Sequence, residues 1–108
     1  MPKEQDLKNL IVEWLNANQI LAYKNNSGVF FFKNKGGNMR CFRAGIKGLP
    51  DISFYLKGGL GGFVETKSKY KKLSKDQEAF KEKAEKQGII YILAYSLEDV
   101  IKKLKNYF

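Results

Sequence analysis

Seven consecutive apolar residues, Ile89 to Tyr95, lie between two stretches that have the pattern of helices. A run of this length suits a β-strand covered on both faces, because a solvated face would need polar residues at alternate positions. The stretch before it, 75–87, consists of helix formers, follows Ser74 as an N-cap and ends at Gly88. We therefore expect a sheet with helices on both sides.

The other elements follow from apolar periodicity and from breaker residues. Two more helices are expected at 4–18 and 97–107, the second capped by Ser96, and strands at 20–23, 29–32, 39–43, 52–56 and 63–67. The runs 20–23 and 29–32 flank a turn at 25–28 and are predicted to pair as a hairpin, as are 52–56 and 63–67 around a glycine-rich turn. The order α-β-β-(β)-β-β-α-β-α predicts an α/β fold with a mixed central sheet flanked by helices. The 108 residues fit one domain.

The residue types exclude several kinds of site. The chain has no histidine and a single cysteine, Cys41, which excludes a zinc finger and a Cys/His catalytic pair. Any metal would have to be held by oxygen ligands. The chain also has no apolar run long enough for a membrane span and no secretory signal at its start, so we expect an intracellular protein without a membrane partner, with a viral or phage source among the possibilities.

The charge distribution indicates a polyanionic partner. Lys and Arg number 20 against 11 Asp and Glu, for a net charge of +9, which is typical of nucleic-acid binding. Between Trp14 and Lys75 the only acids are Asp51 and Glu65, in a stretch rich in Lys and Arg. Two isolated carboxylates in a basic segment are candidates for chemistry rather than for charge balance.

These two acids lie in a pattern that suits metal binding. Asp51 follows Pro50, and after thirteen more residues comes Glu65-Thr66-Lys67. On adjacent strands of a hairpin the carboxylates would lie within about 5 Å and would repel each other unless a cation lay between them. Mg²⁺, or Mn²⁺ in its place, is bound by one or two carboxylates with waters and phosphate oxygens, and the carbonyl of Thr66 could add a ligand.

Lys67 lies on the same strand face as Glu65, because the two are separated by one residue. Its ammonium group could orient the attacking water, help to deprotonate it, or neutralise charge on the phosphate. The alternative is a strand-start aspartate and an ordinary cross-strand surface pair.

The residues around this pair resemble a known family. Pro50-Asp51 and Glu65-Thr66-Lys67 are similar to the core of the PD-(D/E)xK nucleases. The wider set resembles the VRR-NUC (virus-type replication-repair nuclease) domain, which is related to archaeal Holliday-junction resolvases. That wider set comprises Glu4 and Leu15 of the first helix, Asn26-Ser27-Gly28, the 43–51 segment RAGIKGLPD, the 73–77 segment LSKDQ and Gly88. The resemblance covers nearly the whole chain and implies a restriction-endonuclease-like fold.

The resemblance also implies roles for individual residues. Asp51, Glu65 and Thr66 would bind the metal, Lys67 would be the catalytic lysine, and Gln77 would point from its helix into the site. Glu4 would be a further acid near the metal, although Asp6 and Glu13 are alternatives in the same helix. Contacts to DNA are expected from Lys24, Asn26, Ser27, Arg43, Lys47, Lys69, Lys71 and Lys72.

Taken together, the sequence predicts a divalent-metal-dependent DNA endonuclease that selects DNA structure, such as a junction, a flap or a site for nicking. A homodimer is expected, because related resolvases act as two-fold dimers. Two alternatives stay open: a non-catalytic nucleic-acid-binding module with the same fold, and a restriction-like enzyme that cuts at specific bases.

Overall fold

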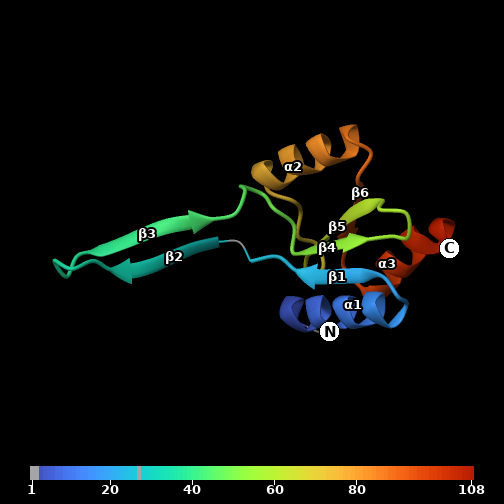
Figure 1. Ribbon diagram of the computed structural model, residues 1–108, viewed down its shortest axis with the longest axis horizontal. Helices are drawn as coiled ribbons and strands as arrows, with labels where there is room; N and C mark the ends of the chain where they lie inside the picture. Colours follow the sequence, from blue (N-terminus) through green and yellow to red (C-terminus); the bar gives the residue numbers. More distant parts are fainter. Residues whose placement is uncertain (1–2, 27) are drawn as a thin grey trace.

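The chain folds into a body and a protruding arm, as the computed structural model shows (Figure 1). The structure describes residues 3–26 and 28–108, with the side chains of 28–32 and 42–44 left out. The elements in chain order are α1 (Glu4–Ala17), β1 (Leu21–Lys24), β2 (Gly28–Lys33), β3 (Met39–Ala44), β4 (Ile52–Tyr55), β5 (Gly61–Thr66), α2 (Lys75–Lys86), β6 (Ile90–Ala94), α3 (Leu97–Leu104) and the short 3-10 helix η1 (Lys105–Tyr107).

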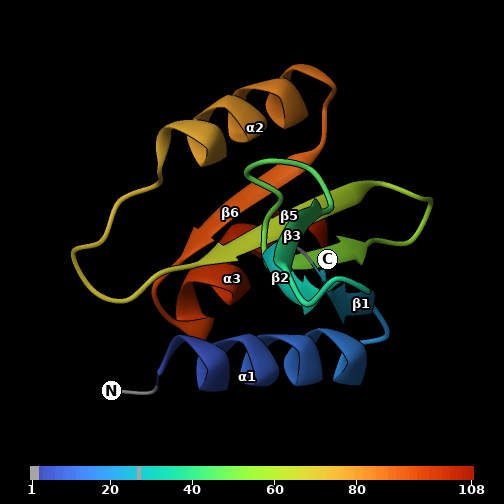
Figure 2. The same ribbon diagram turned by 90° about the vertical axis from the view of Figure 1, so that its left-hand side faces the viewer.

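The body is a three-layer α/β structure. Its sheet has the order β1-β4-β5-β6, with antiparallel pairing except for the parallel pair β5 and β6. Helix α2 connects the parallel pair and covers one face, and α1 and α3 cover the other (Figures 1 and 2). The predicted mixed sheet between helices is confirmed, and β6 is the strand predicted to be covered on both faces.

The core lies between the sheet and the layer formed by α1 and α3. Apolar residues at helical spacing on α1, Leu7, Ile11 and Leu15, are buried against the sheet. Phe54 of β4 is fully buried, and its ring lies where a Cβ at Gly62 would be. Glycine at position 62 therefore makes room for the largest fully buried side chain of the core.

The helix ends are set by local hydrogen bonds, as the caps predict. The Ser74 hydroxyl accepts a hydrogen bond from the Gln77 N–H, and the Gln77 side chain accepts one from the Ser74 N–H, which together form a capping box. Ser96 forms the same motif with Asp99 at the start of α3. The last helix is shorter than the predicted 97–107 span, because its final turn tightens into η1.

The predicted hairpin between residues 20–23 and 29–32 is wrong. Instead β1 pairs with β4, from Leu21 opposite Tyr55 to Lys24 opposite Ile52. Strand β2 pairs with β3, from Gly28 opposite Ala44 to Lys33 opposite Met39. Adjacency in sequence suggested the wrong partner. The pairing with β4 buries Ala22 of β1 in the core of the body.

The β2–β3 hairpin, residues 28–44, is called the arm below. It extends away from the body and gives the molecule a longest dimension of 55 Å, against 33 and 28 Å in the other directions (Figure 1). The side chains of Phe30, Phe31 and Phe32 lie outside the described residues. Among the helices that the structure describes, none has the length and apolarity that a membrane crossing requires.

Candidate active site

The strand register brings the two isolated acids together. Ile52 of β4 pairs with Val64 of β5, so the next opposed positions in this antiparallel ladder are those of Asp51 and Glu65. Both lie at the end of the sheet where β1 ends at Lys24, because Lys24 pairs with Ile52 and Ile52 with Val64. The arm leaves the body at this end (Figure 1). The juxtaposition expected from the sequence is therefore present in the structure.

The Asp51 carboxylate is held from two sides. Its Oδ2 accepts hydrogen bonds from the Thr66 backbone N–H (2.8 Å) and the Thr66 hydroxyl (2.7 Å). Its Oδ1 lies 3.3 Å from the Lys8 ammonium of α1. These contacts fix the orientation of the carboxylate, and they give Thr66 a positioning contact that the sequence did not indicate.

Glu65 is the least solvated acid of the site. It is only 4% exposed, and its Oε1 has no hydrogen-bond partner among the described residues. Burial first, and then the negative charge of Asp51 and a hydrogen bond with Asp51, raise the pKa of the Glu65 carboxyl to about 8, against the opposing effect of Lys67 and Lys8. A buried carboxyl with a free oxygen beside a second carboxylate is an unfavourable arrangement unless a proton or a cation is present.

The face of the sheet under α2 contains a second buried group of this kind. Tyr91 of β6 lies opposite Phe63 in the register, and Phe63 packs edge-on against Phe80 of α2. The Tyr91 hydroxyl also has no partner within the described part of the chain. Burial, and then the charge of Glu65, raises the pKa of Tyr91 above its usual range.

This donor set fits a divalent cation. Asp51 contributes a fixed carboxylate, Glu65 contributes an oxygen without a partner, and hard cations such as Mg²⁺ take oxygen ligands of this kind. Among the side chains that the structure describes, no three Asp, Glu, Cys or His side chains come together in a group that could hold a metal ion. The site therefore offers two protein carboxylates, within the range that Mg²⁺ uses when water and phosphate complete its shell.

Glu4 lies at the margin of this site. Its Oε1 accepts a hydrogen bond from the Ser68 N–H (2.8 Å) and lies 3.7 Å from the Lys71 ammonium. The bond from Ser68 lowers the pKa of Glu4, and the charges of Lys71 and Lys67 act in the same direction. Of the three acids considered in the first helix, Glu4 is the one with these contacts, whereas Asp6 and Glu13 are exposed.

Lys67 affects the pKa of the acids of the site, whereas the side chain of Gln77 is used in a helix cap. Lys67 is half-buried directly after β5, and its positive charge lowers the pKa of both Glu65 and Glu4. The Gln77 side-chain oxygen accepts the Ser74 N–H in the capping box. That oxygen is therefore engaged in starting α2, and a role for Gln77 in the site stays a prediction.

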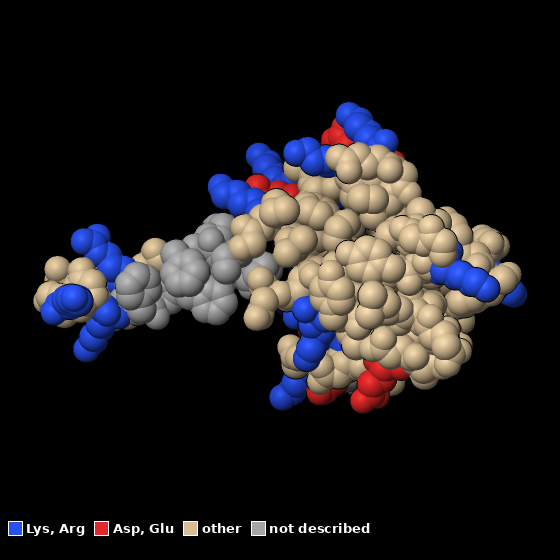
Figure 3. Space-filling view, viewed as in Figure 1, with Lys and Arg blue, Asp and Glu red and all other residues tan. Residues whose placement is uncertain are grey.

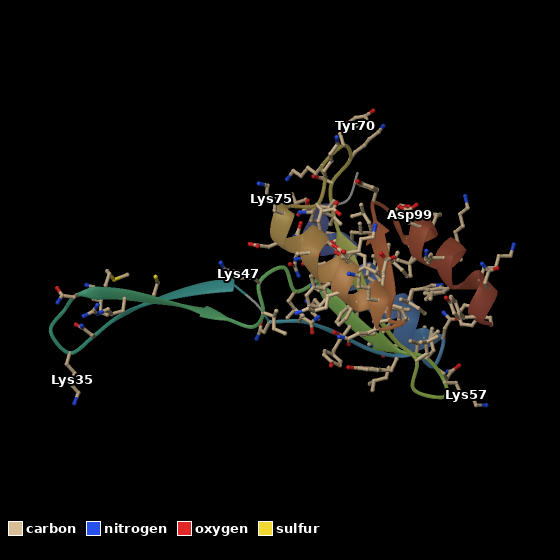
Figure 4. The ribbon with its side chains drawn as sticks, turned by 90° about the horizontal axis from the view of Figure 1, so that it is seen from above. Lys35, Lys47, Lys57, Tyr70, Lys75 and Asp99 are labelled. Atoms are coloured by element: carbon tan, nitrogen blue, oxygen red, sulfur yellow. The ribbon has the colours of Figure 1, made fainter. Side chains whose placement is uncertain are left out.

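The predicted DNA contacts are distributed around this edge of the body. Lys47 lies at the base of the arm (Figure 4), Asn26 is exposed, and Lys69, Lys71 and Lys72 are exposed in the loop after β5. The Lys24 ammonium donates a hydrogen bond to Asn9 of α1 (2.8 Å). Ser27 and the side chain of Arg43 lie outside the described residues.

Sequence reasoning missed two residues of this region. Lys8 lies one helical turn after Glu4 and forms the ion pair with Asp51, so its spacing from Glu4 was a usable signal. Asn25 ties the chain before the arm to the chain around Asp51: its N–H donates to the Asp51 carbonyl (2.7 Å) and its amide to the Pro50 carbonyl (3.0 Å). No local pattern marked Asn25, because its partners are more than twenty residues away.

A close backbone approach fixes the loop before Asp51. Gly48 has a φ of 76°, and a Cβ at this position would collide with the backbone of Asp76 and Gln77 in the first turn of α2. Glycine is therefore required both by the left-handed conformation and by the contact. The loop that leads into Asp51 is held against the start of α2.

Comparisons with known proteins identify a solved structure with the same fold. No family model matches the sequence, and no curated protein matches it either. A solved structure described as "VRR_NUC domain" is similar to this chain with a TM-score of 0.69 and 24% sequence identity, over 100% of both chains. This chain therefore has the fold of a VRR_NUC domain, as its motifs predicted.

Proposed function

We propose that this protein is a divalent-metal-dependent nuclease that hydrolyses phosphodiester bonds in DNA. The observation that carries the proposal is the buried Glu65, with an oxygen that lacks a partner among the described residues, opposite the fixed carboxylate of Asp51. Two such groups at one sheet edge, in a chain of net charge +9, suit a cation that a polyanionic substrate also contacts. The shared VRR_NUC fold supports the same reading.

Different residues of the site would bind the cation, orient its ligands and contact the substrate. Asp51 and Glu65 would hold the cation, with the Thr66 carbonyl as a further candidate ligand, and Thr66 would orient Asp51 through its N–H and hydroxyl. A bound Mg²⁺ or Mn²⁺ would supply Lewis-acid activation of the phosphodiester. Lys67, two residues after Glu65, would orient the attacking water or neutralise charge that develops on the phosphate.

Lys8 suggests how the site changes when a cation binds. Its ammonium now balances the charge of Asp51 at 3.3 Å, and α1 positions it one turn from Glu4. If Asp51 and Glu65 held a divalent cation, the charge of Asp51 would no longer need Lys8 as its partner. Lys8 would then turn toward the nearest phosphate of the substrate.

The substrate is proposed to be DNA recognised by its backbone and shape. Exposed cations line the edge that carries the site, and the tip of the arm adds Lys33, Lys35 and Arg40, all exposed (Figure 3). Contacts of this kind are made to phosphates and carry no base sequence, so they favour selection of DNA structure. A homodimer would place two such sites on two strands, and gel filtration with light scattering would measure it.

The decisive experiment is cleavage of labelled linear, flap, splayed and four-way DNA with Mg²⁺, Mn²⁺ or Ca²⁺. We expect cleavage with Mg²⁺ or Mn²⁺, binding without turnover with Ca²⁺, and a loss of about 1,000-fold in rate for Asp51→Asn with binding retained. Glu82→Gln, the corresponding loss of a carboxylate at an exposed position of α2, is the control and should cut like the wild type.

Other outcomes would discriminate between the alternatives. Binding without cleavage by the wild type under all three metals would support a non-catalytic module and overturn the nuclease. Discrete fragments from long linear DNA would indicate base-specific cutting instead of structure selection.

A further inference from the structure

The loop between β5 and α2 presents an aromatic side chain to solvent. Tyr70 is 85% exposed, and it lies at the outermost point of the loop with its ring directed away from the body (Figure 4). Its φ is 74°, in the left-handed region that favours glycine. The turn is closed by the Lys71 N–H, which donates to the Ser68 carbonyl (3.1 Å), so Tyr70 is the third residue of the turn, where glycine or asparagine is usual. A bulky ring at this position works against local stability.

The turn that carries Tyr70 is anchored on both sides. Before it, the Ser68 N–H donates to Glu4 of α1 (2.8 Å). After it, the Tyr95 hydroxyl donates to the Lys71 carbonyl (2.7 Å). Hydrogen bonds on both sides therefore hold the turn and its exposed ring in place. A strained backbone conformation that the surrounding structure maintains is frequent at ligand-binding sites.

Beside the ring lies an open hollow of about 670 Å³. It is lined by Lys69, Tyr70, Lys72, Tyr95, Ser96 and Asp99. The hollow has the size of a small-ligand site, and it combines two tyrosines with two lysines. The Lys69 ammonium lies 5.1 Å from the centre of the Tyr70 ring, so cation and aromatic face are presented together.

This combination matches the chemistry of an unpaired nucleotide. Proteins that bind single-stranded DNA stack bases on aromatic rings and neutralise the backbone with lysine or arginine. A base within a duplex has both faces covered by its neighbours and cannot stack on a protein ring. An apolar ligand without charge would not use Lys69 and Lys72.

We propose that the hollow between Tyr70 and Tyr95 binds an unpaired nucleotide of the substrate, with the base stacked on Tyr70 and its phosphate near Lys69 and Lys72. This inference rests on the proposed nuclease function and narrows its substrate class. Tyr70 follows Lys67 by three residues, so the chain limits their separation to about 10 Å. The preferred DNA then has at least one unpaired base near the cut, as in a flap or a splayed end.

The test uses binding in Ca²⁺ to a flap oligonucleotide with a fluorescent adenine analogue in its unpaired segment, against a fully paired duplex of the same length. The wild type and Tyr70→Phe should quench the fluorescence and prefer the flap by about 5- to 100-fold. Tyr70→Gly should lose the quenching and the preference while it keeps its affinity for duplex. Its melting temperature should not fall, because glycine suits the left-handed conformation. Tyr107→Ala, at a half-exposed tyrosine near the C-terminus, is the control and should behave like the wild type.

The outcomes separate this inference from the nuclease itself. Equal flap preference in the wild type and Tyr70→Gly, or no quenching by the wild type, overturns the nucleotide site whether or not DNA is cut. Quenching and preference without cleavage in Mg²⁺ would uphold the nucleotide site and overturn the nuclease.

Discussion

The body and the arm use the same secondary structure for opposite purposes. In the body, strands β4, β5 and β6 are almost wholly buried, and their ends hold Asp51 and Glu65 in place. At the tip of the arm, the side chains of Lys33, Lys35, Met39 and Arg40 are all exposed, and residues 28–44 contain no acid (Figure 3). Strands packed between helices can hold carboxylates against their mutual repulsion, whereas a two-stranded ribbon can only project charge.

The two regions meet where the chemistry is proposed. Asn25, just before the arm, is bonded to the backbone of Pro50 and Asp51, just after it. The same amide also bonds the buried Ser53 hydroxyl of β4 (2.8 Å). If the protein cleaves DNA as proposed, a substrate contacted by the arm would lie next to the two acids.

The largest difference between the regions should appear in stability. Phe54→Ala removes the largest fully buried side chain, and we expect the free energy of unfolding to fall by about 3–5 kcal/mol. Met39→Ala at the tip of the arm, where the side chain is 60% exposed, should change it by less than about 0.5 kcal/mol. Urea unfolding followed by circular dichroism measures both. Equal effects would contradict the division into a packed body and an arm that packs little.

The second difference concerns pH and belongs to the body alone. In metal-free protein the pKa of Glu65 is about 8 when folded, above the ordinary value of 4.5. Between these values the folded state keeps a proton that the unfolded state has lost, so the free energy of unfolding should fall as pH rises from 4.5 to 8, by up to about 1.4 kcal/mol per pH unit.

Glu65→Gln removes this titration and should flatten the pH profile, with the gain over the wild type largest near pH 8. Urea titrations in EDTA across this range measure the slope. Glu82→Gln, an exposed acid of α2, is the control and should keep the wild-type profile. A wild-type profile that rises through this range would contradict the buried, protonated Glu65.

The smallest effect is expected from the arm, and it should appear only in DNA affinity. Replacing Lys33, Lys35 and Arg40 by alanine should reduce the slope of log affinity against log salt by about 2.7, because each phosphate that is no longer neutralised accounts for roughly 0.9 of the slope. The melting temperature should stay unchanged. Fluorescence anisotropy at several salt concentrations in Ca²⁺ measures the slope.

The control removes the same charge at the other end of the molecule. Lys57 lies far from the arm in Figure 4, and Lys103 and Lys105 lie in the last helical turns near the C-terminus. The triple alanine variant of these three lysines should change the slope much less. Equal slopes for the two variants would mean that only net charge matters and that the arm makes no specific contact.

Local signals predicted the helices and their starts well. Ser74 and Ser96 are N-caps in the structure as in the prediction, because a cap depends on residues only three positions away. The pair Asp51 and Glu65 was also predictable, since β4 and β5 are joined by a short glycine-rich turn that leaves few registers possible. The partner of β1 was not, since its neighbour in the sheet lies some thirty residues further along the chain.

What the sequence by itself determined is the set of chemical groups and the class of fold: a sheet between helices, two lone acids in a basic segment, and no histidine. Tertiary structure alone decided the environment of those groups. It buried Glu65 beside Asp51, placed Lys8 against Asp51, turned the arm away from the body, and braced the turn of Tyr70 between α1 and Tyr95. The physical reason is range: periodicity and caps act over a few residues, whereas burial and charge pairing depend on segments that only the folded chain brings together.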